Sequence, residues 1–260
     1  MNTFQLTRKE MADLLLSLKG WNSKSALSIL QDAWMVSRTL QQNEEPLIKT
    51  FASATLPVIF EKLMKYEEYD MGLSLNEIAD LGRQIENTNF SITTLQNWVK
   101  RDIKEMVGSP QKGKKYSIEQ AALLFIVEDL KTALDFDSIR KLLQLIVNDP
   151  ADQEDDLINP VRLYAAYSSL FQELNTDYTY LYNNEELHTA IQKIELSIER
   201  KAKELSHTFQ HATNGQHEAI TNVIVIASLS VHTAYFQMMA KRYLSATLFL
   251  HNIGELSSPE

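Results

Sequence analysis

Three segments of this 260-residue chain carry the same local signal for the start of an α-helix. In each segment, a serine or threonine is followed three positions later by glutamate or glutamine, so that each side chain can accept a hydrogen bond from the other residue's backbone N–H. The pairs are Thr7–Glu10, Ser74–Glu77 and Ser117–Gln120. Because only seven glycines and six prolines are present to form turns, the sequence predicts an all-α protein.

Apolar residues recur at helical spacing outside these three segments as well. Further helices are expected after the caps Ser25 and Asp135 or Asp137, and over 47–54, 58–66, 161–174, 185–211 and 217–249. Gly82 is expected to end a helix in the left-handed conformation, and Asn214–Gly215 is expected to form a turn.

An acidic segment, 148–160, divides the chain. It contains five Asp or Glu and two prolines, a composition typical of a linker. We therefore expect an N-terminal helical segment over 1–70 and a central domain over 71–150. A C-terminal helical region over 151–260 would serve dimerisation or sensing.

The segment 91–116 of the central domain combines an amphipathic helix with a basic loop. One side of the helix is apolar and carries Ile92, Leu95, Trp98 and Val99. The opposite side has no carboxylate and is rich in hydrogen-bond donors: Thr93, Thr94, Asn97, Lys100 and Arg101, with Gln96 at its flank. We assign Trp98 and Tyr116 to the core, since a tryptophan on the apolar side supports the loop rather than stacking on a base.

The loop after this helix carries Lys112, Lys114 and Lys115 around Gly113, as expected at the tip of a small β-wing. A helix whose exposed side can meet base edges, beside a loop that can meet phosphates, is the arrangement of a winged helix-turn-helix on DNA. The candidate DNA-binding residues are Thr93, Thr94, Gln96, Asn97, Lys100, Arg101, Lys112, Lys114 and Lys115.

The charge distribution fits selective binding of nucleic acid better than general coating. The whole chain has a net charge of −9, whereas 91–116 holds six Lys or Arg against two acids, which leaves +4. Unselective affinity follows the neutralisation of phosphates, which an acidic protein does poorly. The same patch would also suit a solvated surface that binds no nucleic acid.

Composition also bears on the compartment. The chain has no cysteine, which fits a reducing environment and excludes disulfides. Its first residues, MNTFQLTRKE, are polar and do not predict a signal peptide, so we expect a cytoplasmic protein. The run 219–240 contains no charged residue, but scattered polar residues favour a helix in a core or subunit interface over a membrane span.

The stretch 73–147 resembles the winged helix-turn-helix of MerR-type bacterial regulators. The matching parts are SLNEIADL, SITTLQNWVKRDI, SPQKGKKYS, IEQAALLFIVEDLK and FDSIRKLLQLI. TTLQNWVKRDI followed by KKYS resembles still more closely a family of uncharacterised bacterial proteins, known mainly as a domain of unknown function. The MerR resemblance implies a homodimer that reads a pseudo-palindrome in double-stranded DNA, with sensing of an unknown small-molecule effector in the C-terminal part.

Other kinds of site have weaker support. His207 and His211 share a helix face and His217 follows them, but the glutamate of an HExxH motif is missing, and we predict no metal and no cofactor. The aromatic residues of the C-terminal region either line an effector pocket or pack in the core: Tyr164, Tyr167, Phe171, Tyr178, Tyr180 and Tyr182. Without a phosphate-binding glycine loop or a Gly-x-Ser-x-Gly motif, no enzyme is predicted.

The sequence therefore predicts a DNA-binding transcriptional regulator that places a recognition helix in the major groove and a basic wing on the backbone. The alternative is a protein-interaction or scaffold module that has a helix-turn-helix architecture and does not bind DNA.

Overall fold

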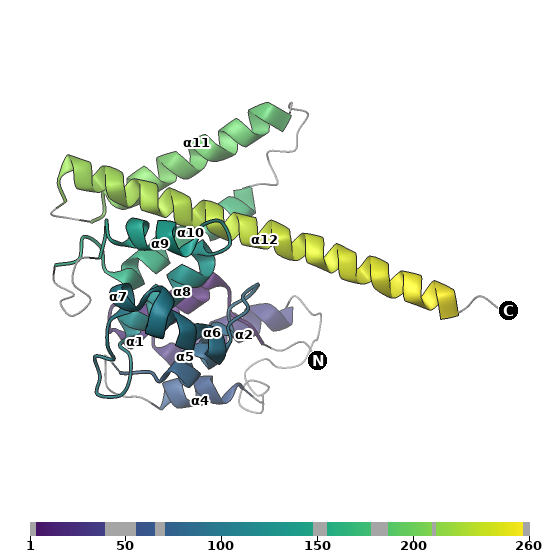
Figure 1. The fold of residues 1–260 in the computed structure, drawn as a ribbon, viewed down its shortest axis with the longest axis horizontal. Coiled ribbons are helices and arrows are strands. Elements are labelled where there is room, and N and C mark those ends of the chain that lie inside the picture. The colour runs from purple at the N-terminus through teal and green to yellow at the C-terminus, as the bar shows by residue number, and fades with distance from the viewer. Residues whose placement is uncertain are drawn as a thin grey trace.

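The computed structural model describes residues 4–39, 56–65, 71–147, 155–177, 187–209 and 212–256, where all regular secondary structure is helical (Figure 1). The predicted all-α class is confirmed. The elements are α1 (Arg8–Leu18), α2 (Ala26–Thr39), α4 (Val58–Met64), α5 (Leu75–Gly82), α6 (Ile92–Asn97), the π-helical turn η1 (Trp98–Asp102), α7 (Lys104–Val107), α8 (Ile118–Leu130), α9 (Phe136–Leu143), α10 (Pro160–Asp177), α11 (Leu187–Ser206) and α12 (Asn214–Leu256). The helix expected over 47–54 lies outside the described residues.

The three predicted capping boxes start α1, α5 and α8. The backbone N–H groups of Thr7, Ser74 and Ser117 donate to Glu10, Glu77 and Gln120 at 2.7, 2.8 and 2.9 Å. In each case the N-cap hydroxyl accepts the reciprocal bond. Ser25 and Asp135 cap α2 and α9 in the same way, through the backbone N–H three residues on. Local hydrogen bonding therefore sets these five helix starts.

Two turn predictions were wrong. Gly82 ends α5 without a left-handed conformation. Among the described glycines, only Gly20, Gly108 and Gly113 have a positive φ. A Cβ on Gly82 would overlap the ring of Phe90, so glycine is required there for close packing. Asn214–Gly215 belongs to the first turn of α12 rather than to a separate turn.

Helix α8 lies at the centre of the core. All 13 of its residues are buried, and α1, α7, α10 and α12 pack against it. The fully buried rings of Tyr164 and Tyr167 from α10 meet edge to face at 5.4 Å, and Phe171 is also buried. These three residues are core residues rather than the lining of a pocket. Tyr178, Tyr180 and Tyr182 lie outside the described residues.

A buried ion pair ties α1 to α8 inside this core. Arg8 Nη2 and Nε donate to Asp129 Oδ1 at 2.8 and 3.0 Å, and the Tyr167 hydroxyl donates to Asp129 Oδ2 at 2.8 Å. Burial lowers the pKa of Arg8, but the charge of Asp129 and its hydrogen bonds outweigh burial and hold that pKa above its ordinary value. Burial and the charge of Asp129 also raise the pKa of Tyr167, which therefore remains a hydrogen-bond donor.

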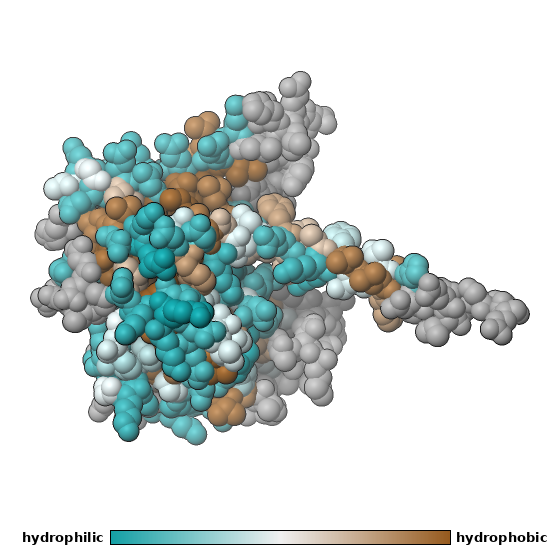
Figure 2. Space-filling model, viewed as in Figure 1, coloured by the Kyte–Doolittle hydropathy of each residue, from teal (hydrophilic) through white to brown (hydrophobic). Residues whose placement is uncertain are grey.

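Helix α12 has a buried half and a projecting half (Figure 1). The first half packs on α8, α10 and α11, and buries Ile220, Ile224 and Val231. The second half leaves the body with exposed apolar side chains, among them Tyr243 at 72% and Leu244 at 59%, and Figure 2 shows hydrophobic residues along this projection. By length and composition, 214–251 is the one helix of the described chain that could cross a membrane.

The environment of His232, in the buried half of α12, predicts that the stability of the protein depends on pH. Its ring packs edge to face on Phe171 at 4.7 Å, and its Nδ1 lies 2.7 Å from the Ser228 carbonyl oxygen. Burial lowers the pKa of His232, and the bond to Ser228 partly opposes this. The unfolded chain then binds the proton more tightly, so the stability contributed by neutral His232 is full above about pH 6.5 and is lost as the pH falls through the lowered pKa.

Urea denaturation at about pH 7.5 and about pH 5.5 tests this prediction. From the higher pH to the lower, the free energy of unfolding should fall less in His232→Gln than in the wild-type protein, because the glutamine side chain is neutral at both pH values. Equal drops in the two proteins would show that His232 does not contribute to the pH dependence.

Candidate nucleic-acid interface

The basic loop is present, but the predicted β-wing is not. Over the described ranges, β-type pairing of the backbone is limited to isolated bridges, of which one lies within this loop and one joins its end, Tyr116, to Leu73. In one, Lys112 N–H and Lys115 N–H each donate to the other's carbonyl, at 2.9 and 3.1 Å, and Gly113 between them has a φ of +68°. The loop is therefore a tight turn, residues 112–115, which we call the lysine turn.

Gln120 holds the start of the loop. Its Nε2 donates to the carbonyls of Val107 and Ser109, both at 2.7 Å, and its Oε1 accepts from the Gln111 N–H at 3.3 Å. One buried side chain thus satisfies three backbone groups between the end of α7 and the lysine turn. The same bonds fix the loop to the end of α7.

The segment just before α5 supports the other end of the lysine turn. Leu73 and Tyr116 exchange two backbone hydrogen bonds of 2.8 Å. A Cβ on Gly72 would lie 2.7 Å from the Cβ of Lys112 and 2.8 Å from that of Lys115, so the turn rests directly on this glycine. The lysine turn is consequently a fixed feature of the surface.

The helix before the loop is anchored by Trp98. Leu95 and Val99 are buried beside it, and Trp98 itself is 2% exposed, which confirms the apolar side and the core assignment predicted from the sequence. The Trp98 ring meets Phe136 of α9 edge to face at 6.1 Å, and the Lys131 ammonium lies 5.1 Å from the ring centroid. Tyr116, also assigned to the core, is likewise buried.

A π-helical turn extends this helix beyond Asn97. The Ile103 N–H donates to the Trp98 carbonyl at 3.0 Å, which is the five-residue spacing of a π-helix. Arg140 of α9 donates to the Asp102 carbonyl at 2.7 Å and so satisfies a group at the end of the turn. Sequence periodicity gives no signal for this turn or for the contact from α9.

The side of α6 and η1 away from the core is polar. We call this surface the polar face, and its exposed members are Thr93, Gln96, Asn97, Lys100 and Arg101. Thr94 is half-buried, and its hydroxyl lies 2.7 Å from Ser91 Oγ, so it serves the start of the helix. Arg101 donates to the carboxylate of its neighbour Asp102 at 2.8 Å, and this pairing raises the pKa of Arg101.

Five cations are exposed along the chain from the polar face to the lysine turn. Lys100, Arg101, Lys112 and Lys114 were predicted as DNA contacts from the sequence. Lys104, which is exposed in α7, was not among the predicted contacts. Its position three residues after Arg101 was the available signal. Lys115, another predicted DNA contact, is half-buried.

The structure describes two of the three histidines considered as metal ligands, His207 and His217. The rings of His207 and His217 lie 4.8 Å apart, and His217 Nδ1 is 3.0 Å from the Ser206 carbonyl oxygen. His211 lies outside the described residues. Within the described ranges, no three His, Cys, Asp or Glu side chains come together in a way that could hold a metal ion.

Residues 64–167 match the model of a family described as a domain of unknown function, DUF1836. Uncharacterized protein YkrK of Bacillus subtilis (strain 168) is 37% identical over 243 residues, which cover 93% of this chain and 97% of that relative. The chain belongs to the DUF1836 family. The DUF1836 region contains α5 to α9, and with them the polar face and the lysine turn.

No solved structure matches the chain. The predicted resemblance to a family of uncharacterised bacterial proteins is confirmed by the DUF1836 match and by YkrK. Neither match bears on the likeness to MerR-type regulators, which remains a prediction.

Proposed function

We propose that this DUF1836 protein is a cytoplasmic DNA-binding transcriptional regulator with a MerR-like helix-turn-helix. The observation that supports it most is the polar face, which is exposed on a helix whose opposite side is fixed by Trp98. The lysine turn is bound to the end of the same segment through Gln120. The order of α5, α6, basic loop and α8 follows the MerR pattern, with the lysine turn in the place of the wing.

Each exposed side chain has a role in this proposal. The Asn97 amide can bond in bidentate fashion to an adenine edge, and Lys100 can reach a guanine or a phosphate. Arg101 can do the same only by leaving Asp102, whereas Lys112 and Lys114 supply phosphate contacts beside the groove. Because the Thr94 hydroxyl is hydrogen-bonded to Ser91, only the Thr94 methyl group is available for a contact with DNA.

The proposal includes a homodimer formed through the projecting half of α12. Tyr243, Leu244 and Leu248 are exposed there on a regular helix, and burial of each such side chain by a second copy would contribute about 1.5–3 kcal/mol. Two long helices can cover such a surface by packing their apolar side chains against each other. A symmetric dimer would present two polar faces to a two-fold symmetric DNA site.

Selection from a randomised duplex pool, repeated at several salt concentrations, tests the proposed function. The wild-type protein should enrich a two-fold symmetric motif. Asn97→Ala should relax preference at one position of each half-site, at a cost of about 1–3 kcal/mol on the preferred sequence. Lys114→Ala should weaken all sequences alike and reduce the salt slope by about one.

Lys203→Ala is the matched control, because this exposed lysine lies on α11, away from the DUF1836 region. It should change neither the motif nor the salt slope. A pool that stays unenriched with the wild-type protein would exclude sequence-specific DNA binding.

The second candidate function is a protein-interaction module, and the projecting half of α12 favours it, since its exposed apolar side chains suit a protein partner. In that case the polar face is only a solvated surface. An unenriched pool, together with no salt-dependent affinity for any duplex, would support this alternative.

A further inference from the structure

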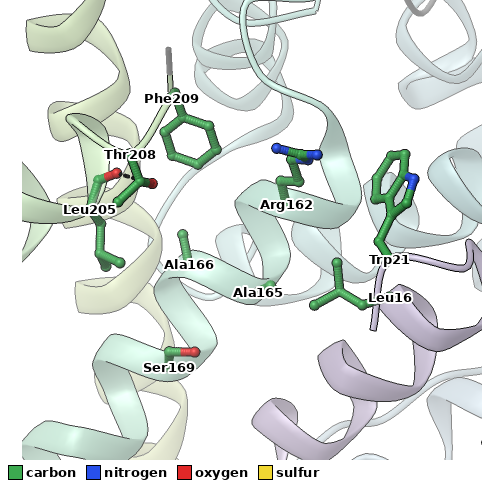
Figure 3. Close-up of a pocket in the computed structure, with 9 residues that line it drawn as sticks. All are labelled: Leu16, Trp21, Arg162, Ala165, Ala166, Ser169, Leu205, Thr208 and Phe209. Atoms are coloured by element: carbon green, nitrogen blue, oxygen red, sulfur yellow. Dashed lines mark hydrogen bonds between the residues drawn. The ribbon is translucent and has the colours of Figure 1, made fainter. Parts of the chain in front are cut away.

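A groove of about 410 Å³ crosses the surface of α10, between the end of α1 and the end of α11 (Figure 3). Its floor is made by Ala165 and Ala166, whose small side chains leave the groove open. One wall is Leu16 of α1, and the other is formed by Leu205 and Phe209. Ser169 of α10 and Thr208 also line the groove, so two hydroxyl-bearing side chains lie beside the apolar floor and walls.

A cation stands at one end of this groove. The guanidinium carbon of Arg162 lies 5.0 Å from the ring centroid of Trp21, and both side chains line the groove (Figure 3). Within the described parts of the chain, no carboxylate pairs with Arg162. Lys19 lies 5.5 Å from the same ring, but Glu119 holds its ammonium at 2.7 Å. Arg162 is thus the cation available to a ligand, and the Trp21 ring orients it.

We propose that this groove binds a small carboxylate that has an apolar tail, such as a medium-chain fatty acid or an arylalkanoic acid. The planar guanidinium of Arg162 matches a carboxylate in a two-bond geometry, which selects the head group. The tail lies over Ala165 and Ala166 and is enclosed by Leu16 and Phe209. A groove of this size lies in the range of small-ligand sites.

The assignment of one carboxylate follows from the distribution of charge. Among the described residues, Arg162 has no carboxylate partner, and it lies at the end of a groove whose floor and walls are largely apolar. This arrangement complements one negative charge followed by an apolar body. A neutral amphiphile would leave Arg162 without a partner, and a short acid would leave the apolar floor uncovered. This site lies outside the polar face, and its occupancy does not depend on whether the protein binds DNA.

Titration of the full chain with decanoate, below its micelle-forming concentration, tests the proposal by calorimetry. Decanol and acetate are the two comparison ligands, because each lacks one half of the proposed interaction. Decanoate should bind at least about tenfold more tightly than decanol, since a charge-assisted pair contributes a tenfold effect or more. It should also bind at least about tenfold more tightly than acetate, since burial of each CH₂ group of the tail contributes up to about 0.8 kcal/mol. Trp21, 43% exposed while Trp34 and Trp98 are buried, should change its fluorescence on binding.

Two substitutions locate the site. Arg162→Gln removes the charge, and Ala165→Met fills the floor; neither residue is buried, so both proteins should fold, as circular dichroism can verify. Each should weaken decanoate binding by about tenfold or more. Arg83→Gln is the matched control, because it removes an exposed guanidinium of α5 that pairs with Asp80.

The proposal is overturned if decanoate does not bind to the wild-type protein. Equal affinity for decanol and decanoate would remove the assignment of a carboxylate. Unchanged binding in both Arg162→Gln and Ala165→Met would place the ligand elsewhere and would likewise reject the site.

Discussion

Replacement of Asp129 by alanine is expected to lower the free energy of unfolding by about 3–5 kcal/mol, because it leaves the Arg8 charge buried without a partner. Both side chains are 3% exposed, so water cannot replace the lost carboxylate. Arg8 would keep only the backbone carbonyl of Glu86, at 3.2 Å, and Tyr167 would lose its acceptor. Urea denaturation measures the change directly.

The control removes the whole polar group at once. In Arg8→Met, Asp129→Leu, Tyr167→Phe, no charge or hydroxyl of this three-residue group is left buried without its partner, and the space stays filled by apolar side chains. Replacement of a buried ion pair by well-packed apolar residues is often neutral, so this protein should be markedly more stable than Asp129→Ala. Equal stability of Asp129→Ala and wild type would show that the ion pair does not hold α1 on α8.

Features that depend on neighbouring residues were predictable from the sequence. A capping box needs only two residues three positions apart, and all three boxes form as expected. The apolar side of the helix at 92–99 was predictable for the same reason, since its spacing is local. The pair of Arg8 with Asp129 was not, because 121 positions separate the two residues and neither has a local signal.

The candidate interface shows the same limit. The basic turn was predictable from Gly113 and the lysines, whereas the hydrogen bonds that hold its start come from Gln120 of a different helix. Arg140, which binds the end of the π-helical turn, comes from α9, 38 positions along the chain. For the groove on α10, the spacing of Arg162, Ala165 and Ala166 indicates one helix face, but its walls come from distant segments.

The charge-free run 219–240 could be predicted only in part. Its apolar residues favour burial, and the first half of α12 is buried against α8, α10 and α11. Hydrophobicity alone does not predict the residue at which such a helix stops packing against the other helices. The projecting half contains exposed apolar residues, and the one local sign of the change is the pair Lys241 and Arg242, which ends the charge-free run.

Replacement of Trp98 by alanine is expected to destabilise the protein by about 3–5 kcal/mol, the usual cost of deleting a buried tryptophan side chain. The substitution removes the edge-to-face contact with Phe136 and the contact of Lys131 with the ring. These contacts fix α6 and η1 against α8 and α9. Hydrogen exchange over 92–107 should therefore become faster by more than the loss in global stability requires.

Two substitutions on the same helix separate anchoring from a general loss of helix. Gln96→Ala changes an exposed side chain of the polar face and should stay within about 0.5 kcal/mol of wild type. Trp98→Phe keeps an aromatic ring toward Phe136 and should lose less stability than Trp98→Ala. If Trp98→Ala unfolded at the wild-type urea concentration, Trp98 would not be the residue that anchors α6 and η1. A recognition helix needs a fixed orientation to place Asn97 against a particular base, so the proposal of DNA recognition would then lose the observation that supports it most.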